Sequence, residues 1–191
     1  PTFRQLKEST RADSDSASGL SLIAEESNLK RLDEILEEQN QILVIKLHPR
    51  DRQSISLSKD HKNIFVIQEN DLKNAGITLQ QVLGKVSALL TDYSSIAFEY
   101  MFLNRPIGYV INDLERYSRG FVIDNPLEYM PGERIEKMED LFAFLKHVYL
   151  GEDDYMEQRA KVVEKLFCNS NPRTGAEDFI KFIEGKNESK N

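Results

Sequence analysis

The chain has 191 residues, 40% of them hydrophobic, and carries a net charge of −7 with an isoelectric point near 5.1. This length supports one sizeable core, and the acidic balance argues against a general nucleic-acid binder, which needs clustered Lys and Arg. The single cysteine, Cys168, excludes a disulfide framework and a cysteine-rich zinc site, and it fits a reducing compartment. No signal peptide or membrane-spanning run is visible, which predicts a cytoplasmic protein.

The N-terminal part of the chain combines a strand end with a polar segment and a helix. Residues 1–4 resemble the tail of a strand, and because no methionine precedes them we expect a fragment of a longer protein. Residues 7–19 are polar and lack apolar periodicity, which predicts a mobile loop. The apolar spacing of residues 20–38 predicts an amphipathic helix.

Short apolar runs and helical patterns alternate in the middle of the chain. The predicted elements are strands at 41–47, 63–67, 88–90 and 107–110, and helices at 79–83 and 94–103. This alternation predicts the α/β class, with a parallel sheet covered by helices on both faces. The connection at 112–131 is irregular and long, a length typical of functional loops.

Three helical patterns, at 137–150, 153–167 and 174–183, close the chain. We therefore predict one Rossmann-like domain over residues 1–184, with C-terminal helices at 136–184 and a disordered tail at 185–191. The charged runs at 33–38 and 152–154 are interpreted as solvated helix faces and caps.

Polar residues gather where the strand at 88–90 ends and the next helix begins. They are Thr91, Asp92, Ser94 and Ser95. A helix start offers unpaired N–H groups and a partial positive charge, so hydroxyls beside it favour an anion site, most often for phosphate. The alternative is that Asp92 or Ser94 serves only as an N-cap.

Further candidate anion contacts lie elsewhere in the sequence. His48 follows the strand at 41–47 and is placed to bond a phosphate oxygen, although a bond to local backbone explains it equally well. Arg4 would project toward the same sheet edge if its strand joins the sheet, and the alternative is an ordinary surface arginine. Arg173 and Thr174 open a second polar corner, where a capping role is the alternative.

The sequence lacks the motifs of several common nucleotide-binding and catalytic sites. The sequence contains neither a P-loop nor a dinucleotide-binding glycine motif, and no nucleophile–histidine–acid pattern. No pair of His or His/Glu residues has metal-ligand spacing, so we predict no structural metal. We also expect no cofactor. His61 and His147 are interpreted as solvated.

Five short motifs occur in one order over residues 1 to about 135. They are Pro1-Thr2-Phe3-Arg4, Lys46-Leu47-His48-Pro49, Leu90-Thr91-Asp92-Tyr93-Ser94-Ser95, Asn104-Arg105-Pro106, and Asp113-Leu114-Glu115-Arg116-Tyr117 followed by Arg119-Gly120-Phe121. This order resembles the C-terminal domain of the CDP-glycerol glycerophosphotransferases, the teichoic-acid primases and polymerases.

The resemblance implies the C-terminal half of a GT-B fold, which holds a CDP-linked donor such as CDP-glycerol. In such enzymes an acceptor hydroxyl attacks the phosphate attached to glycerol, and CMP leaves. His48 would be the catalytic candidate and contact the donor phosphates, Ser94 and Ser95 would cradle the pyrophosphate, and Thr91, Asp92 and Arg4 would complete the corner. An N-terminal acceptor domain with the general-base histidine is expected to be absent from this chain. The full-length enzyme would lie on the cytoplasmic membrane face and act on a lipid-linked polymer.

The identity of the donor stays open at this point. The family often carries an Asp-Gly-Lys-Ala-Ser-like turn before its last helix, whereas residues 171–176 here supply only Arg173 and Thr174 as loose counterparts. CDP-ribitol and capsular polymers are therefore also possible. The alternatives are a UDP-sugar-using GT-B glycosyltransferase or 2-epimerase domain, and a non-catalytic interaction domain with an acidic helical C-terminal region.

Overall fold

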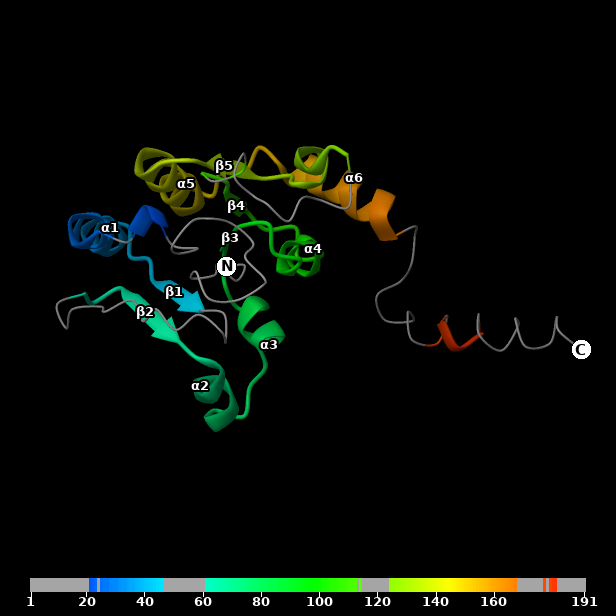
Figure 1. Cartoon of the computed structure of the whole chain (residues 1–191), viewed down its shortest axis with the longest axis horizontal. Coiled ribbons are helices and arrows are strands. Elements are labelled where there is room, and N and C mark those ends of the chain that lie inside the picture. Colours follow the sequence, from blue (N-terminus) through cyan, green and yellow to red (C-terminus); the bar gives the residue numbers. More distant parts are fainter. Residues whose placement is uncertain are drawn as a thin grey trace, which may run out of the picture.

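The computed structural model describes residues 21–23, 25–46, 61–112, 114, 124–167, 177 and 179–181 (Figure 1). Its elements in chain order are η1 (Ser21–Ile23), α1 (Glu26–Glu38), β1 (Leu43–Lys46), β2 (Ile64–Ile67), α2 (Glu69–Asn74), α3 (Leu79–Leu83), β3 (Leu89–Thr91), α4 (Ile96–Met101), β4 (Ile107–Val110), η3 (Pro126–Tyr129), β5 (Glu133–Ile135), α5 (Met138–Leu150) and α6 (Met156–Phe167).

The strands are all parallel, as predicted, but they form two sheets. β1 pairs with β2, and β3, β4 and β5 pair in that order. Within the described ranges, β1 and β3 therefore each have only one strand partner. The α/β class is confirmed. The predicted single parallel sheet is not seen in these ranges, where the strands form two separate sheets.

One hydrophobic core connects the two sheets. The stripe Leu29, Leu32 and Leu36 on α1 recurs every three or four residues, as an amphipathic helix requires, and all three side chains are buried. They share a core with Ile45 of β1 and Phe144 of α5. Figure 1 shows α1 and α5 on the same side of the molecule. A common layer of apolar side chains thus holds the two sheets in one unit.

A second core covers the opposite face of the three-stranded sheet. Tyr100 and Met101 of α4 and Val162 of α6 pack with Ile107 and Tyr109 of β4. Helices therefore cover both faces of this sheet. The two-stranded sheet differs, because Val44 and Phe65, which pair in register, leave 40% and 48% of their surface exposed.

The predicted helices and strands are confirmed in outline, with most ends shifted by one to three residues. Three elements were missed, and one of them is the short helix η3 inside the connection predicted to be irregular. α2 has one buried residue, Leu72, and a reciprocal capping box between Gln68 and Asp71 stabilises it. β5 is three residues long and contains two charged residues, so it lacks an apolar run. The predicted loop at 7–19 and tail at 185–191 lie outside the described residues, as does most of the helix at 174–183.

Two carboxylates that we expected on solvated faces are structural. Asp33 of α1 is buried and accepts hydrogen bonds from the backbone N–H groups of Lys62 (3.1 Å) and Asn63 (2.7 Å), which joins α1 to the start of β2. Asp153 forms an ion pair with Arg159. Sequence spacing put both on charged runs, and only the tertiary contacts reveal their roles.

Arg159 is the most deeply buried charge among the described residues, with no exposed surface. Besides Asp153, its guanidinium donates to the Pro131 carbonyl and to the Asn104 side-chain oxygen, both at 3.3 Å. These contacts tie α6 to the lead-in of β5 and to the turn between α4 and β4. A buried cation is tolerated only when it is paired and hydrogen-bonded in this way.

Replacing Asp153 should therefore leave an uncompensated charge in the core. We expect Asp153→Asn to lower the free energy of unfolding by about 3 kcal/mol in urea titrations. The matched control is Asp154→Asn, at an exposed neighbour. Equal effects of the two substitutions would show that the Arg159 pair contributes little.

His147 was expected to be solvated, but its Nδ1 lies 3.0 Å from a Glu133 carboxylate oxygen. That hydrogen bond raises the pKa of His147 above its ordinary value of 6.5. The histidine therefore stabilises the fold fully below about pH 6.5, and this contribution is lost as pH rises through the raised pKa. Because the side chain is 41% exposed, we expect less than about 1 kcal/mol. Unfolding curves between pH 5 and 9 should show this decline, and His147→Gln should remove it.

Candidate functional site at the β3–α4 corner

The predicted site residues Thr91, Asp92, Ser94 and Ser95 occupy the corner between β3 and α4. Thr91 and Asp92 are 4% and 3% exposed, whereas Ser94 is half-buried and Ser95 is exposed. The Ser94 N–H donates to Asp92 Oδ1 at 3.2 Å. Asp92 thus closes the turn that leads from the strand into the helix, and the two serines lie on its open side.

The capping interpretation does not describe this corner. The N-cap residue is Ser95, and its side chain makes no capping hydrogen bond. Asp92 bonds an N–H that precedes the helix. The Ala97 and Phe98 N–H groups bond the Ser94 and Ser95 carbonyls at 3.2 and 3.0 Å. The Ser95 side chain is therefore not used to cap the start of the helix.

Two buried residues that carry hydroxyl groups pair in register next to the corner. Thr91 of β3 pairs with Tyr109 of β4, and neither hydroxyl has a hydrogen-bond partner in the part of the chain that the structure describes. Burial raises the pKa of Tyr109, against an opposing influence from the Arg159 charge. Tyr109 is therefore neutral at physiological pH.

The charges at the corner limit what it can bind and how. The Asp92 carboxylate would repel a phosphate, and it accepts the hydrogen bond from the Ser94 N–H that closes the turn. The contacts available to an anion are the hydroxyls of Ser94 and Ser95 and backbone N–H groups near the helix start. All of these donors are neutral.

Four predicted contacts lie outside the described residues: Arg4, His48, Arg173 and Thr174. They stay sequence-based predictions. The structure brings together Thr91, Asp92, Ser94 and Ser95 only.

The sequence did not predict a set of hydrogen bonds at the end of the β3–α4 pair opposite to the corner. The Val86 carbonyl, in the segment leading into β3, accepts from the Tyr100 hydroxyl at 3.0 Å and from Arg105 Nη1 at 2.7 Å. Arg105 Nη1 also donates to the Gly84 carbonyl at 3.2 Å. The only sequence signal for these contacts was the Asn104-Arg105-Pro106 motif, whose role spacing alone does not reveal.

The profile of the family described as CDP-Glycerol:Poly(glycerophosphate) glycerophosphotransferase matches residues 1–184. The chain belongs to this glycerophosphotransferase family. The resemblance found in the sequence is thereby confirmed.

The individual relatives of this chain are distant. It is 26% identical over 141 residues to the teichoic acid ribitol-phosphate polymerase TarK of Staphylococcus aureus (strain NCTC 8325 / PS 47), covering 73% of this chain and 26% of that protein. It is 35% identical over 102 residues to the teichoic acid glycerol-phosphate primase of Bacillus subtilis (strain 168), covering 52% and 25%. A solved structure of the wall teichoic acid polymerase TagF is 20% identical, with a TM-score of 0.47, covering 84% of this chain and 48% of that one. The chain thus spans about a quarter of these curated relatives.

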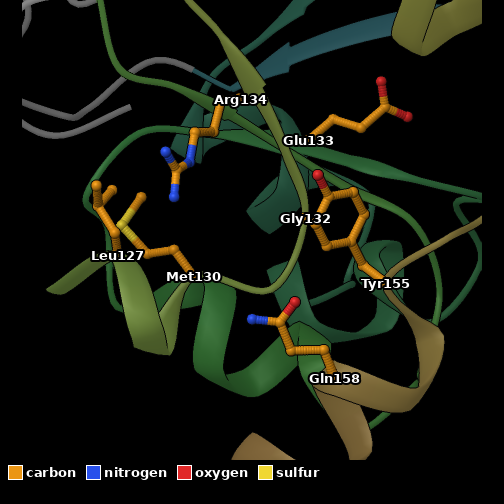
Figure 2. A pocket seen from close by; sticks show the side chains of 7 residues that line it. All are labelled: Leu127, Met130, Gly132, Glu133, Arg134, Tyr155 and Gln158. Carbon is orange, nitrogen blue, oxygen red and sulfur yellow. The ribbon is translucent and has the colours of Figure 1, made fainter.

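A pocket of about 410 Å³ lies away from the corner, beside the edge strand β5 (Figure 2). Its lining is Leu127, Met130, Gly132, Glu133, Arg134, Tyr155 and Gln158. Figure 2 shows Arg134 and Glu133 on opposite sides of the β5 ribbon. Glu133 is already paired with His147, so the pocket offers one cation without a second converging charge, and we assign it no ligand.

No group of three metal-ligating side chains occurs among the residues with described positions. Within the same residues, no helix is long and apolar enough to cross a membrane.

The unpartnered Thr91 hydroxyl gives a stability test of the corner. Thr91→Val keeps the shape and removes a buried, unsatisfied polar group, so we expect the free energy of unfolding to stay equal or rise by up to about 1 kcal/mol. Thr78→Val is the contrasting control, because Thr78 caps α3 by accepting from Gln81 N–H at 3.2 Å and its loss should cost about 1 kcal/mol. Destabilisation by Thr91→Val similar to the control would indicate that the Thr91 hydroxyl is satisfied.

Proposed function

We propose that this chain is the donor-binding part of a transferase that moves glycerol phosphate, or a related alditol phosphate, from a CDP-linked donor to a teichoic-acid or capsular polymer. The observation that carries this proposal is the family match over residues 1–184, because the family is described by a CDP-glycerol donor and a poly(glycerophosphate) acceptor. The full-length enzyme would meet its lipid-linked acceptor at the cytoplasmic face of the membrane.

The β3–α4 corner is the proposed pyrophosphate site. Ser94 and Ser95 would donate to phosphate oxygens, and Thr91 and Asp92 would shape the turn. His48, as the catalytic candidate, would stabilise charge on the departing CMP phosphate. Phosphoryl transfer depends mostly on positioning and charge stabilisation, so a corner rich in neutral donors suits it. Support comes from the buried turn held by Asp92 and from serine side chains that do not cap the helix.

The remaining proposed contacts come from both ends of the chain. Arg4 would approach the pyrophosphate from the N-terminal strand, and Arg173 with Thr174 would add contacts before the last helix. Each supplies a donor or positive charge that Asp92 makes necessary, because a doubly charged diphosphate beside a carboxylate needs compensation.

The finer fold proposed is the C-terminal half of a GT-B enzyme, with β1–β2 and β3–β4–β5 as two parts of one parallel sheet. The shared core between α1 and α5 supports this arrangement, because it spans both sheets.

Nucleotide titration tests the proposed function directly. We expect the chain to bind CDP-glycerol and CMP in calorimetry, and Ser94→Ala combined with Ser95→Ala to weaken CDP-glycerol binding by about tenfold or more, since hydrogen bonds to a charged group are lost. Ser87→Ala, at an exposed serine before β3, is the control. Tighter binding of a UDP-sugar would favour the glycosyltransferase alternative. Absence of binding by any nucleotide at millimolar concentration would favour a non-catalytic domain.

A further inference from the structure

Arg105 belongs to the Asn104-Arg105-Pro106 motif and makes no contact with the candidate site. It lies in the turn between α4 and β4, half-buried, and one guanidinium nitrogen, Nη1, donates to the carbonyls of Val86 (2.7 Å) and Gly84 (3.2 Å). Both acceptors precede β3. Arg105 therefore ties the segment that follows α4 to the segment that leads into β3.

Tyr100 reaches the same point from inside α4. Its ring is 1% exposed and its hydroxyl donates to the Val86 carbonyl at 3.0 Å, so a single acceptor takes two donors from the end of α4 and the turn after it. The neighbouring motif residues act nearby: the Pro106 carbonyl accepts from Leu89 N–H at 3.0 Å, and the Asn104 side chain accepts from Arg159.

These bonds lie at the end of the β3–α4 pair opposite to the corner. β3 runs toward Thr91 and α4 runs back from Ser95, with the helix packed beside the strand. Joining the far ends fixes the angle between strand and helix. That angle sets where Ser94 and Ser95 lie relative to Thr91 and Asp92.

We propose that Arg105, together with Tyr100, is a positioning residue of the β3–α4 corner and acts through the Val86 carbonyl. Because the proposed ligand is the pyrophosphate of a CDP-linked donor, this inference rests on the proposed function. Arg105 sets the geometry of the corner without touching the donor.

A small change in this angle has a large consequence. The six residues of α4 span about 9 Å, so a tilt of roughly 10° about one end displaces the other by about 1.5 Å. Displacements near 1 Å are enough to change rates by about 100-fold in sites that depend on positioning. Phosphoryl transfer is such a reaction.

The test compares Arg105→Gln, Arg105→Lys and Tyr100→Phe in the 191-residue chain. Matched controls are Arg134→Gln and Tyr149→Phe, at exposed positions on β5 and α5. The first readout is the backbone amide NMR shifts of residues 92–96 without ligand, and the second is the Kd for CDP-glycerol. We expect Arg105→Gln to shift the corner amides and to weaken binding by about tenfold. Arg105→Lys, which keeps a charged donor nitrogen, should recover part of both, and neither control should change them.

The outcomes separate this inference from the proposed function. If Arg105→Gln moves only the amides near residues 84–86 and 105, Arg105 is merely structural and the inference is wrong. If the corner amides shift but the unmodified chain binds no cytidine nucleotide, the positioning role stands and the proposed donor is wrong. Should Arg105→Gln fail to fold, Tyr100→Phe decides, because it removes one hydroxyl and keeps the packing; unchanged corner amides in that variant would then overturn the proposal.

Discussion

A single buried guanidinium, that of Arg159, holds together the half of the molecule that carries the candidate site. Its bonds to Asp153, Pro131 and Asn104 join α6 to the lead-in of β5 and to the turn after α4. Fully buried charges cost several kcal/mol unless every donor has a partner, so these segments cannot drift apart independently. The second core, between α4, α6 and β4, forms within this constraint.

Two consecutive residues, Asn104 and Arg105, connect the Arg159 contacts to the β3–α4 pair. Asn104 binds Arg159, and its neighbour Arg105 binds the Val86 carbonyl ahead of β3. Asn104 adopts a left-handed φ of 48°, which turns the chain sharply between α4 and β4. Polar contacts thus fix the far end of the β3–α4 pair, while the near end, at Asp92 to Ser95, keeps serine side chains available. Catalysis by positioning requires a rigid scaffold and hydrogen-bond donors that remain available to the ligand.

The sequence predicted the strands and helices whose apolar spacing is strong, such as α1, β4 and α5, and it predicted the corner from residue types at a strand end. It could not predict β5, whose sequence is Glu-Arg-Ile, because pairing with β4 rather than local pattern makes it a strand. Asp33 and Asp153 were assigned to solvated helix faces or caps and His147 to solvent, because charge runs on helices usually face water. The partners of Asp33 and His147 lie 14 to 30 residues away, and the Arg159 partner of Asp153 lies on the following helix. Their roles depend on tertiary distance, which periodicity does not contain.

Two buried polar side chains near the corner reduce the stability of the fold. Thr91 and Tyr109 are buried and pair in register, and neither hydroxyl has a hydrogen-bond partner within the part of the chain that is described. Each such group costs on the order of 1–3 kcal/mol relative to a satisfied one, and valine or phenylalanine would fill the same space without that cost. Folding alone therefore gives no reason for these two side chains. Under the proposed function, the polar end of β3 beside the turn at Asp92 would present donors to a charged ligand, and this would link the energetic cost at Thr91 to the proposed donor site.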